Sequence, residues 1–137
     1  VFEALFLLLA FVDKLSISTP SVNHQVSKLS GGNIQKVLLG REIETNPSLM
    51  ITAYPARGLD INAAHTVYDL LNEQKQKDVG ILFVGEDLDV LLELCDRVMI
   101  LCQGKITGIV DTDNITKEEI GFMMAGERLD IVNDEVC

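Results

Sequence analysis

The segment Leu29-Ser30-Gly31-Gly32-Asn33 places a hydroxyl group and two glycines directly before a predicted helix. The helix is expected from about Ile34 to Glu44, where apolar residues recur among residues that favour helices. A helix start has unpaired backbone N–H groups and the positive end of the helix dipole, and glycine lets an anion approach the backbone closely. The segment therefore predicts a phosphate-binding loop. A Ser-Gly-Gly turn that merely begins a helix is the alternative, because such turns are common.

Strand and helix signals alternate along the rest of the chain. Helices are expected at about 1–15, 62–76, 88–95 and 117–124, and strands at about 49–53, 80–84, 97–101 and 106–110. Asp60 is placed to cap one helix, Thr116 and Glu119 form a capping box for another, and Gln103-Gly104 suits a tight turn. The pattern predicts an α/β fold, mostly a parallel sheet flanked by helices. Strand 49–53 shows no alternation, as expected of a strand buried on both faces.

Charge and composition exclude several kinds of function. Residues 1–60 carry five Lys or Arg and five Asp or Glu, whereas residues 61–137 carry six against sixteen, so the second part holds the whole net charge of −10. Nucleic acid is not an expected partner, because binding to its phosphates needs clustered basic residues. The three cysteines have no paired spacing, so we expect no zinc or other metal site within the chain. The apolar run at residues 1–12 is shorter than the ~20 residues of a spanning helix.

Several motifs resemble those of the ATP-binding cassette (ABC) ATPases, in the order and spacing of that family. LSGGNIQK, from Leu29 to Lys36, resembles the signature motif in the form found in importers of simple sugars and nucleosides. Residues 46–51 resemble the loop and strand of the Walker B motif, and PARGLD, from Pro55 to Asp60, resembles the D-loop turn. Residues 80–84, 87–89 and 95–100 are similar to the elements that end such domains. The resemblance covers about residues 22–126.

The resemblance implies part of a P-loop NTPase domain of the ABC type. Residues 1–28 would be the end of the helical subdomain and a linker, residues 29–126 the carboxyl-terminal part of the nucleotide-binding domain, and residues 127–137 an acidic tail. No Walker A string, G-x-x-x-x-G-K-[ST], occurs in the chain, and the one Gly-Lys pair, Gly104-Lys105, lies in the expected hairpin turn. Without the portion that carries Walker A, we expect one face or edge of the sheet to be open and apolar.

The resemblance also implies which residues bind nucleotide. The signature loop comprises Leu29, Ser30, Gly31, Gly32, Asn33, Gln35 and Lys36, and the D-loop comprises Gly58, Leu59 and Asp60. In the family, two nucleotide-binding domains pair head to tail, and each ATP with its Mg²⁺ lies between the Walker A loop of one domain and the signature loop of the other. The implied partners are therefore a second nucleotide-binding domain and membrane permease subunits, at the cytoplasmic face of the membrane.

Three positions depart from the family pattern. The Walker B strand of the family ends in Asp and Glu, which hold Mg²⁺ and polarise water, whereas this chain has Ala53 and Tyr54 there. Neither side chain can take these roles at neutral pH. Glu86 replaces the switch histidine, and a carboxylate at that position repels a γ-phosphate. We therefore expect no catalytic residue in this chain, no ATP hydrolysis by the chain alone, and a structural role for Tyr54.

Three functional hypotheses follow. The first is an ATP-binding part of an ABC importer that supplies the signature loop to a composite site and powers uptake of a simple sugar or nucleoside. The second is a degenerate, non-catalytic ABC domain that serves as a regulatory or scaffolding module. The third is a truncated product without function.

Overall fold

The computed structural model describes residues 11–127, which belong to two compact units, Val1–Val84 and Gly85–Cys137. The first ten residues of the expected helix at 1–15 lie outside the described residues, and so does the expected acidic tail apart from Glu127. Residues 11–14 are helical, as expected.

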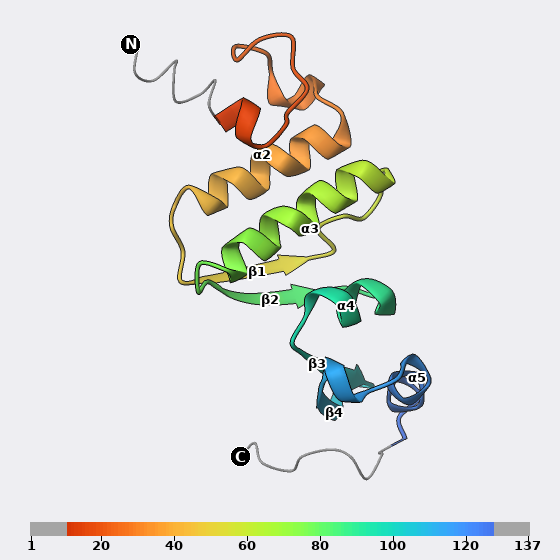
Figure 1. The fold of residues 1–137 in the computed structure, drawn as a ribbon. Helices are drawn as coiled ribbons and strands as arrows, with labels where there is room; N and C mark the ends of the chain where they lie inside the picture. The colour runs from red at the N-terminus through yellow and green to blue at the C-terminus, as the bar shows by residue number, and fades with distance from the viewer. Residues whose placement is uncertain (1–10, 128–137) are drawn as a thin grey trace. The chain divides into compact units, whose positions relative to one another are not determined.

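The first unit contains a β-α-β element with a second helix packed on it (Figure 1). Strand β1 (Leu49–Ala53) pairs in parallel with β2 (Gly80–Val84), and α3 (Ile61–Lys75) connects them. Helix α2 (Gly31–Ile43) packs against α3, and the short 3-10 helix η1 (Val26–Lys28) precedes it. This arrangement confirms the expected parallel pairing, because parallel neighbours require a crossover and α3 supplies it.

Helix α3 lies between α2 and the β1–β2 pair and contributes buried residues to the core of the first unit. Asp60 caps its first turn by accepting a hydrogen bond from the backbone N–H of Ala63 at 3.0 Å, as expected. Its buried residues recur at helical spacing, which gives the helix one apolar face. The buried apolar cluster consists of Leu15, Ile17, Leu39, Ile43, Met50, Val67, Leu70 and Leu71.

The opposite face of the β1–β2 pair is open in the described residues. Leu49, Ile51 and Leu82 are 58%, 69% and 48% exposed, whereas Met50 is buried in the core. The expectation that strand 49–53 is buried on both faces is therefore wrong for the part of the chain that the structure describes. The physical reason is that α3 covers one face only, and the exposed apolar face is the open surface expected without the Walker A portion.

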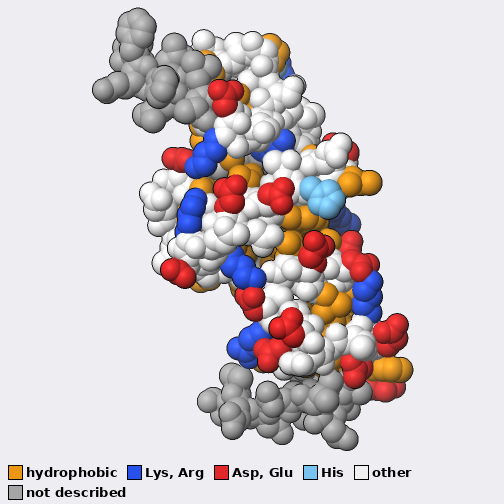
Figure 2. Space-filling view, in the orientation of Figure 1, with side chains coloured by type: hydrophobic (Ala, Val, Ile, Leu, Met, Phe, Trp, Pro, Cys, Tyr) orange, Lys and Arg blue, Asp and Glu red, His pale blue; other side chains and the backbone are white. Residues whose placement is uncertain are grey.

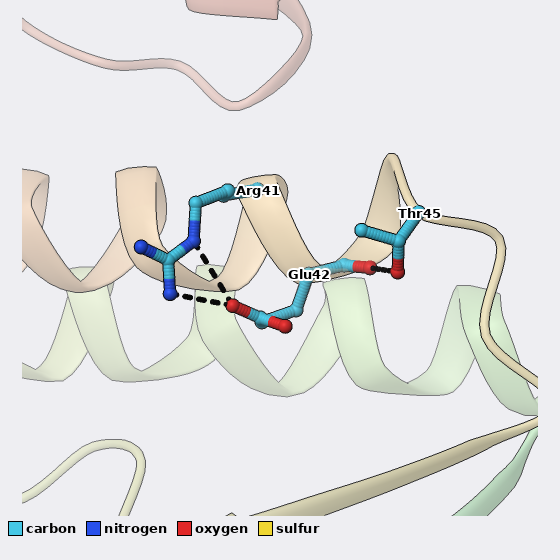
Figure 3. Close-up of polar contacts among 3 residues, drawn as sticks. All are labelled: Arg41, Glu42 and Thr45. Carbon is cyan, nitrogen blue, oxygen red and sulfur yellow. Dashed lines mark hydrogen bonds and ion pairs between the residues drawn. The ribbon is translucent and has the colours of Figure 1, made fainter.

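Helix α2 begins three residues earlier than expected. Ser30 is its N-cap residue, with extended backbone angles of φ −63° and ψ 156°, and Gly31 and Gly32 lie inside the first turn. The two glycines thus adopt helical angles and are not a separate loop. At the other end, the Thr45 hydroxyl donates to the carbonyl of Glu42 at 2.7 Å, beside the exposed Arg41–Glu42 ion pair (Figure 3). The same carbonyl also accepts a hydrogen bond from the backbone N–H of Thr45 at 3.2 Å, so Thr45 closes the end of the helix.

The second unit is a hairpin covered by a helix. Helix α4 (Leu88–Leu94) precedes β3 (Arg97–Cys102) and β4 (Lys105–Asp111), which pair in antiparallel fashion. The 3-10 helix η2 (Thr112–Asn114) and α5 (Lys117–Met124) follow, and α5 packs on both strands. Gln103 and Gly104 have φ of 49° and 75°, the two positive values that a type I′ turn requires, so the expected tight turn is confirmed. The buried apolar residues of this unit are Leu91, Val98, Ile100, Val110, Ile120 and Met123.

The capping box of α5 is formed as expected. The Thr116 hydroxyl accepts from the backbone N–H of Glu119 at 3.3 Å, and the Glu119 carboxylate accepts from the backbone N–H of Thr116 at 2.8 Å. The backbone hydrogen bond from Thr116, followed by that from its hydroxyl group, lowers the pKa of the Glu119 carboxyl group. The ionised carboxylate therefore stabilises the start of α5.

Charged side chains of both signs are interspersed on the surface shown in Figure 2. Acidic side chains predominate in the second unit, where residues 85–127 carry ten Asp or Glu against three Lys or Arg. Within residues 11–127, no helix is both long enough and apolar enough to cross a membrane.

Candidate nucleotide-binding loop

The start of α2 presents unpaired backbone N–H groups beside a hydroxyl group. Ser30 and Gly31 are exposed, and the Ser30 side chain makes no capping hydrogen bond to the helix. The first N–H groups of a helix have no carbonyl partner within it, so those of Gly31 and Gly32 remain available as donors. A Cβ atom added at Gly31 would have no neighbouring atom within 4 Å, which means that the backbone there is open to a ligand. The arrangement can bind an anion by the means expected from the sequence.

Asn33 connects this helix start to a distant segment of the chain. Its Oδ1 accepts a hydrogen bond from the backbone N–H of Ser18 at 3.0 Å. Its Nδ2 donates to the carbonyl of Ser18 at 3.2 Å and to the Ser30 hydroxyl oxygen at 2.9 Å. Both functional groups of the amide are therefore engaged within the protein.

Lys36 points to the same segment. Its Nζ donates to the backbone carbonyl of Ser16 at 3.1 Å, and the residue is only 9% exposed. Ser16 has a φ of 49°, in the left-handed region. Of the other expected signature residues, Leu29 packs against the apolar core and Gln35 is half-buried. Lys36 and Leu29 thus attach these residues to the rest of the first unit, while Ser30 and Gly31 are exposed to solvent.

The D-loop lies directly beside the signature loop. A Cβ atom added at Gly32 would lie 3.0 Å from the Cβ of Ala63 and 4.0 Å from Cδ2 of Leu59. Asp60 caps the helix that carries Ala63, and Gly58 has a φ of 76°, which favours glycine. Gly32 therefore allows the starts of α2 and α3 to approach each other, and the two predicted motifs form one contiguous surface.

Ala53 and Tyr54, the positions expected to match the Walker B carboxylates, lie at the end of β1. Ala53 pairs with Val84 in the sheet, and the backbone N–H of Tyr54 donates to the Val84 carbonyl at 2.8 Å. Tyr54 has a φ of 50°, and the Arg57 guanidinium carbon lies 5.7 Å from the centroid of its ring. Tyr54 is thus a turn residue whose ring contacts an arginine. Glu86, the position of the switch histidine, is an exposed residue of the second unit.

The residues at the end of β1 do not fit a Mg²⁺ ion. Ala53 offers no oxygen ligand from its side chain, and a neutral phenol is a poor substitute for a carboxylate. Among residues 11–127, no group of three or more His, Cys, Asp or Glu side chains could hold a metal ion.

Sequence reasoning predicted a site at the signature-loop residues but missed the contacts that hold it in place. The sequence gives no sign that Asn33 bonds to Ser18, that Lys36 bonds to Ser16, or that Gly32 contacts Ala63. These contacts join positions that lie 15 to 31 residues apart, and they follow from the packing of α2.

The chain is similar in sequence to two sugar-import proteins. It is 44% identical over 118 residues to the xylose import ATP-binding protein XylG of Moorella thermoacetica, across 86% of this chain and 23% of that protein. It is 35% identical over 114 residues to the galactose/methyl galactoside import ATP-binding protein MglA of Clostridium perfringens, across 83% of this chain and 22% of that protein. The chain thus spans less than a quarter of the length of these relatives.

A solved ATP-binding subunit of an ABC transporter has a similar fold. It aligns with a TM-score of 0.69 and 28% identity, across 90% of this chain and 50% of that structure. No family model matches the chain. Sequence and fold together define the class: the chain belongs to the ABC family of ATP-binding proteins and corresponds to the carboxyl-terminal part of a nucleotide-binding domain. Within that family, its two relatives above are sugar-import ATP-binding proteins.

Proposed function

We propose that this chain supplies the signature loop of a composite ATP site in an ABC importer that takes up a simple sugar or nucleoside. A second nucleotide-binding domain contributes the Walker A loop and the carboxylates that hold Mg²⁺. The membrane permease subunits couple ATP turnover to uptake at the cytoplasmic face of the membrane. Xylose and galactose are the sugars in the names of the two relatives, and a pentose or hexose is therefore the first solute to test.

The exposed start of α2 is the observation that carries this proposal. The Ser30 hydroxyl and the backbone N–H groups of Gly31 and Gly32 are the donors that would face the phosphate groups of ATP. Supporting contacts hold these donors in place, since Asn33 and Lys36 bind the 16–18 segment and Gly32 contacts α3. Donors fixed in advance bind an anion without having to be reordered by it.

The end of β1 favours an asymmetric role for this chain. Ala53 and Tyr54 offer neither a ligand for Mg²⁺ nor a general base, so ATP turnover takes place at the site that this chain completes on its partner. The chain's own Walker B side is then catalytically silent.

Gly31 provides the sharpest test in the assembled ATPase. A Cβ atom at Gly31 has no neighbouring atom within 4 Å, whereas a Cβ atom at Gly32 would lie 3.0 Å from the Cβ of Ala63 and press on α3. Gly31→Asp places a carboxylate near the bound phosphates, and two unit charges ~4 Å apart repel by about 4 kcal/mol at an effective dielectric constant of 20. We expect steady-state phosphate release to fall by at least about tenfold.

Gly31→Asn is the matched control, because it has the same size and no charge. We expect it to reduce phosphate release by no more than about threefold, since no charge repulsion is introduced. Equal turnover in both variants and the unchanged protein would refute the proposed site.

A non-catalytic scaffolding role is the second candidate, and the loss of the three chemical groups at Ala53, Tyr54 and Glu86 favours it. In that case both Gly31 variants leave turnover of the assembly unchanged. Uptake of labelled xylose, galactose and a nucleoside by cells that carry Gly31→Asp or Gly31→Asn then separates the two candidates, because only the signature-loop role predicts a specific loss with Asp.

A further inference from the structure

The amide of Asn33 lies between the Ser18 backbone and the Ser30 hydroxyl group, and its orientation is fixed by one of these contacts. The backbone N–H of Ser18 can only donate, so the Asn33 atom 3.0 Å from it must be the amide oxygen. The amide nitrogen therefore faces the Ser18 carbonyl at 3.2 Å and the Ser30 oxygen at 2.9 Å.

This orientation determines what the Ser30 hydroxyl group can do. An amide nitrogen only donates, so the Ser30 oxygen accepts from Asn33 and cannot donate to it. The hydroxyl proton of Ser30 is consequently left for another acceptor. Ser30 is exposed and its side chain does not cap the helix, so that acceptor can be a ligand at the start of α2.

We propose that Asn33 is a positioning residue that makes the Ser30 hydroxyl group a hydrogen-bond donor to the anion bound at the start of α2. This inference deepens the proposed function and rests on it. Asn33 acts through Ser30 and through the Ser18 backbone, which fixes the direction of the amide.

The 16–18 segment is the part of the chain that holds the amide in this orientation. Lys36 donates from a largely buried position to the Ser16 carbonyl at 3.1 Å, two residues before Ser18. Asn33 and Lys36 lie one turn apart on α2, so the helix contacts this segment at two points. The segment in turn fixes which end of the Asn33 amide faces Ser30.

Asn33→Asp reverses the hydrogen bond at Ser30. A carboxylate can still accept from the Ser18 N–H, and an acidic residue suits the first turn of a helix. However, it can only accept from Ser30, so the hydroxyl proton turns toward Asp and away from the bound anion. The new charge also repels the anion, and the experiment must separate these two effects.

A double-mutant cycle with Ser30→Ala makes this separation in the assembled ATPase. Charge repulsion by Asp is present whether residue 30 is Ser or Ala, and it cancels when the two losses of phosphate release are compared. The reversal of the hydroxyl group is possible only with Ser. We expect Asn33→Asp to reduce turnover about tenfold more with Ser30 present than with Ser30→Ala. An effect of about tenfold corresponds to the free energy of one hydrogen bond to a charged group.

A purely structural role for Asn33 predicts equal losses in the two backgrounds, and a ratio within about twofold would overturn the inference. Asn33→Leu, an uncharged variant of similar size, provides a second cycle if the Asp variants do not fold. Its loss of about three- to fivefold should also vanish with Ser30→Ala. The Gly31→Asp and Gly31→Asn pair tests the proposed function separately: if that pair responds as expected while both cycles are additive, the loop binds ATP and only the role of Asn33 is wrong.

Discussion

Gly40 allows α2 to contact the segment that precedes the signature loop, and its replacement by alanine is a stringent test of this packing. A Cβ atom at Gly40 would lie 2.1 Å from Cδ1 of Leu15 and 2.5 Å from Cζ of Phe11, distances that no real carbon atoms tolerate. Leu15 is itself a core residue, only 1% exposed, so it has little freedom to move away. The substitution must therefore displace the side chains of Leu15 and Phe11 from their positions against the helix.

Two opposing terms set the change in the free energy of unfolding. Alanine is preferred to glycine in a helix by about 0.8–1.0 kcal/mol. Overpacking of a buried contact costs about 1–3 kcal/mol. Gly121 in α5 is the matched control, because it is also a helical glycine but a Cβ atom there has no neighbour within 4 Å. Because both variants gain the same helix propensity, Gly40→Ala should be less stable than Gly121→Ala by the overpacking term alone, about 1–3 kcal/mol.

Urea unfolding of the chain, followed by circular dichroism, measures the difference. Each variant is compared with the unchanged chain through the transition of its own unit, since Gly40 and Gly121 lie in different units. We expect a lower midpoint for Gly40→Ala and an equal or higher midpoint for Gly121→Ala, with unchanged slopes. If Gly40→Ala were as stabilising as Gly121→Ala, the close contact between α2 and residues 11–15 would not exist.

Further predictions concern the other features of the chain. Tyr54→Ala should leave phosphate release by the assembled ATPase unchanged, because Tyr54 serves only as a turn residue, and a large loss would assign it chemistry. Ala53→Asp combined with Tyr54→Glu should not create a second efficient site of ATP hydrolysis while Glu86 remains. Single-turnover assays test this when the partner domain's own catalytic site is disabled, so that only the second site can contribute. Hydrogen bonds lower the Glu119 pKa below its ordinary value of 4.5, so the stability that the carboxylate provides is present above that pH and is lost as the pH falls through the lowered pKa. Glu119→Gln should abolish this part of the acid dependence of helix content. An unaltered acid profile would contradict the prediction. Ile51→Ser should reduce the binding of a hydrophobic dye by the chain without lowering its stability, since the residue is 69% exposed.

Local signals were sufficient to predict the helix caps and the tight turn. The Asp60 cap, the Thr116–Glu119 box and the Gln103-Gly104 turn depend on residues close in sequence, and the structure has all three. The prediction was wrong where the answer depended on packing. Strand 49–53 is apolar on both faces, and only the fold shows that α3 covers one of them. The start of α2 was also displaced, because glycine is compatible both with a loop and with a first helical turn.

The candidate site was predictable to a similar extent. Its exposed part, Ser30 and Gly31, follows from a short motif whose chemistry is that of a helix start. Lys36 is predicted to belong to the site because it is part of the LSGGNIQK motif, yet its ammonium group binds the Ser16 carbonyl. Which neighbours orient a motif depends on contacts between distant segments, and such contacts are not encoded in the motif itself.

The same contacts are independent of the strand end at which Ala53 and Tyr54 stand where the family pattern has carboxylates. The loop is held by the Ser18 backbone through Asn33, by Ser16 through Lys36, and by the α3 start through Gly32. The end of β1 is held by different interactions, chiefly the 2.8 Å hydrogen bond from Tyr54 to the Val84 carbonyl. Because the two sets of interactions use different residues, substitutions at Ala53 and Tyr54 change the chemistry at the strand end without removing any bond that orients the loop. These separate supports suit the proposed role, in which the chain completes the site of a partner without a catalytic site of its own.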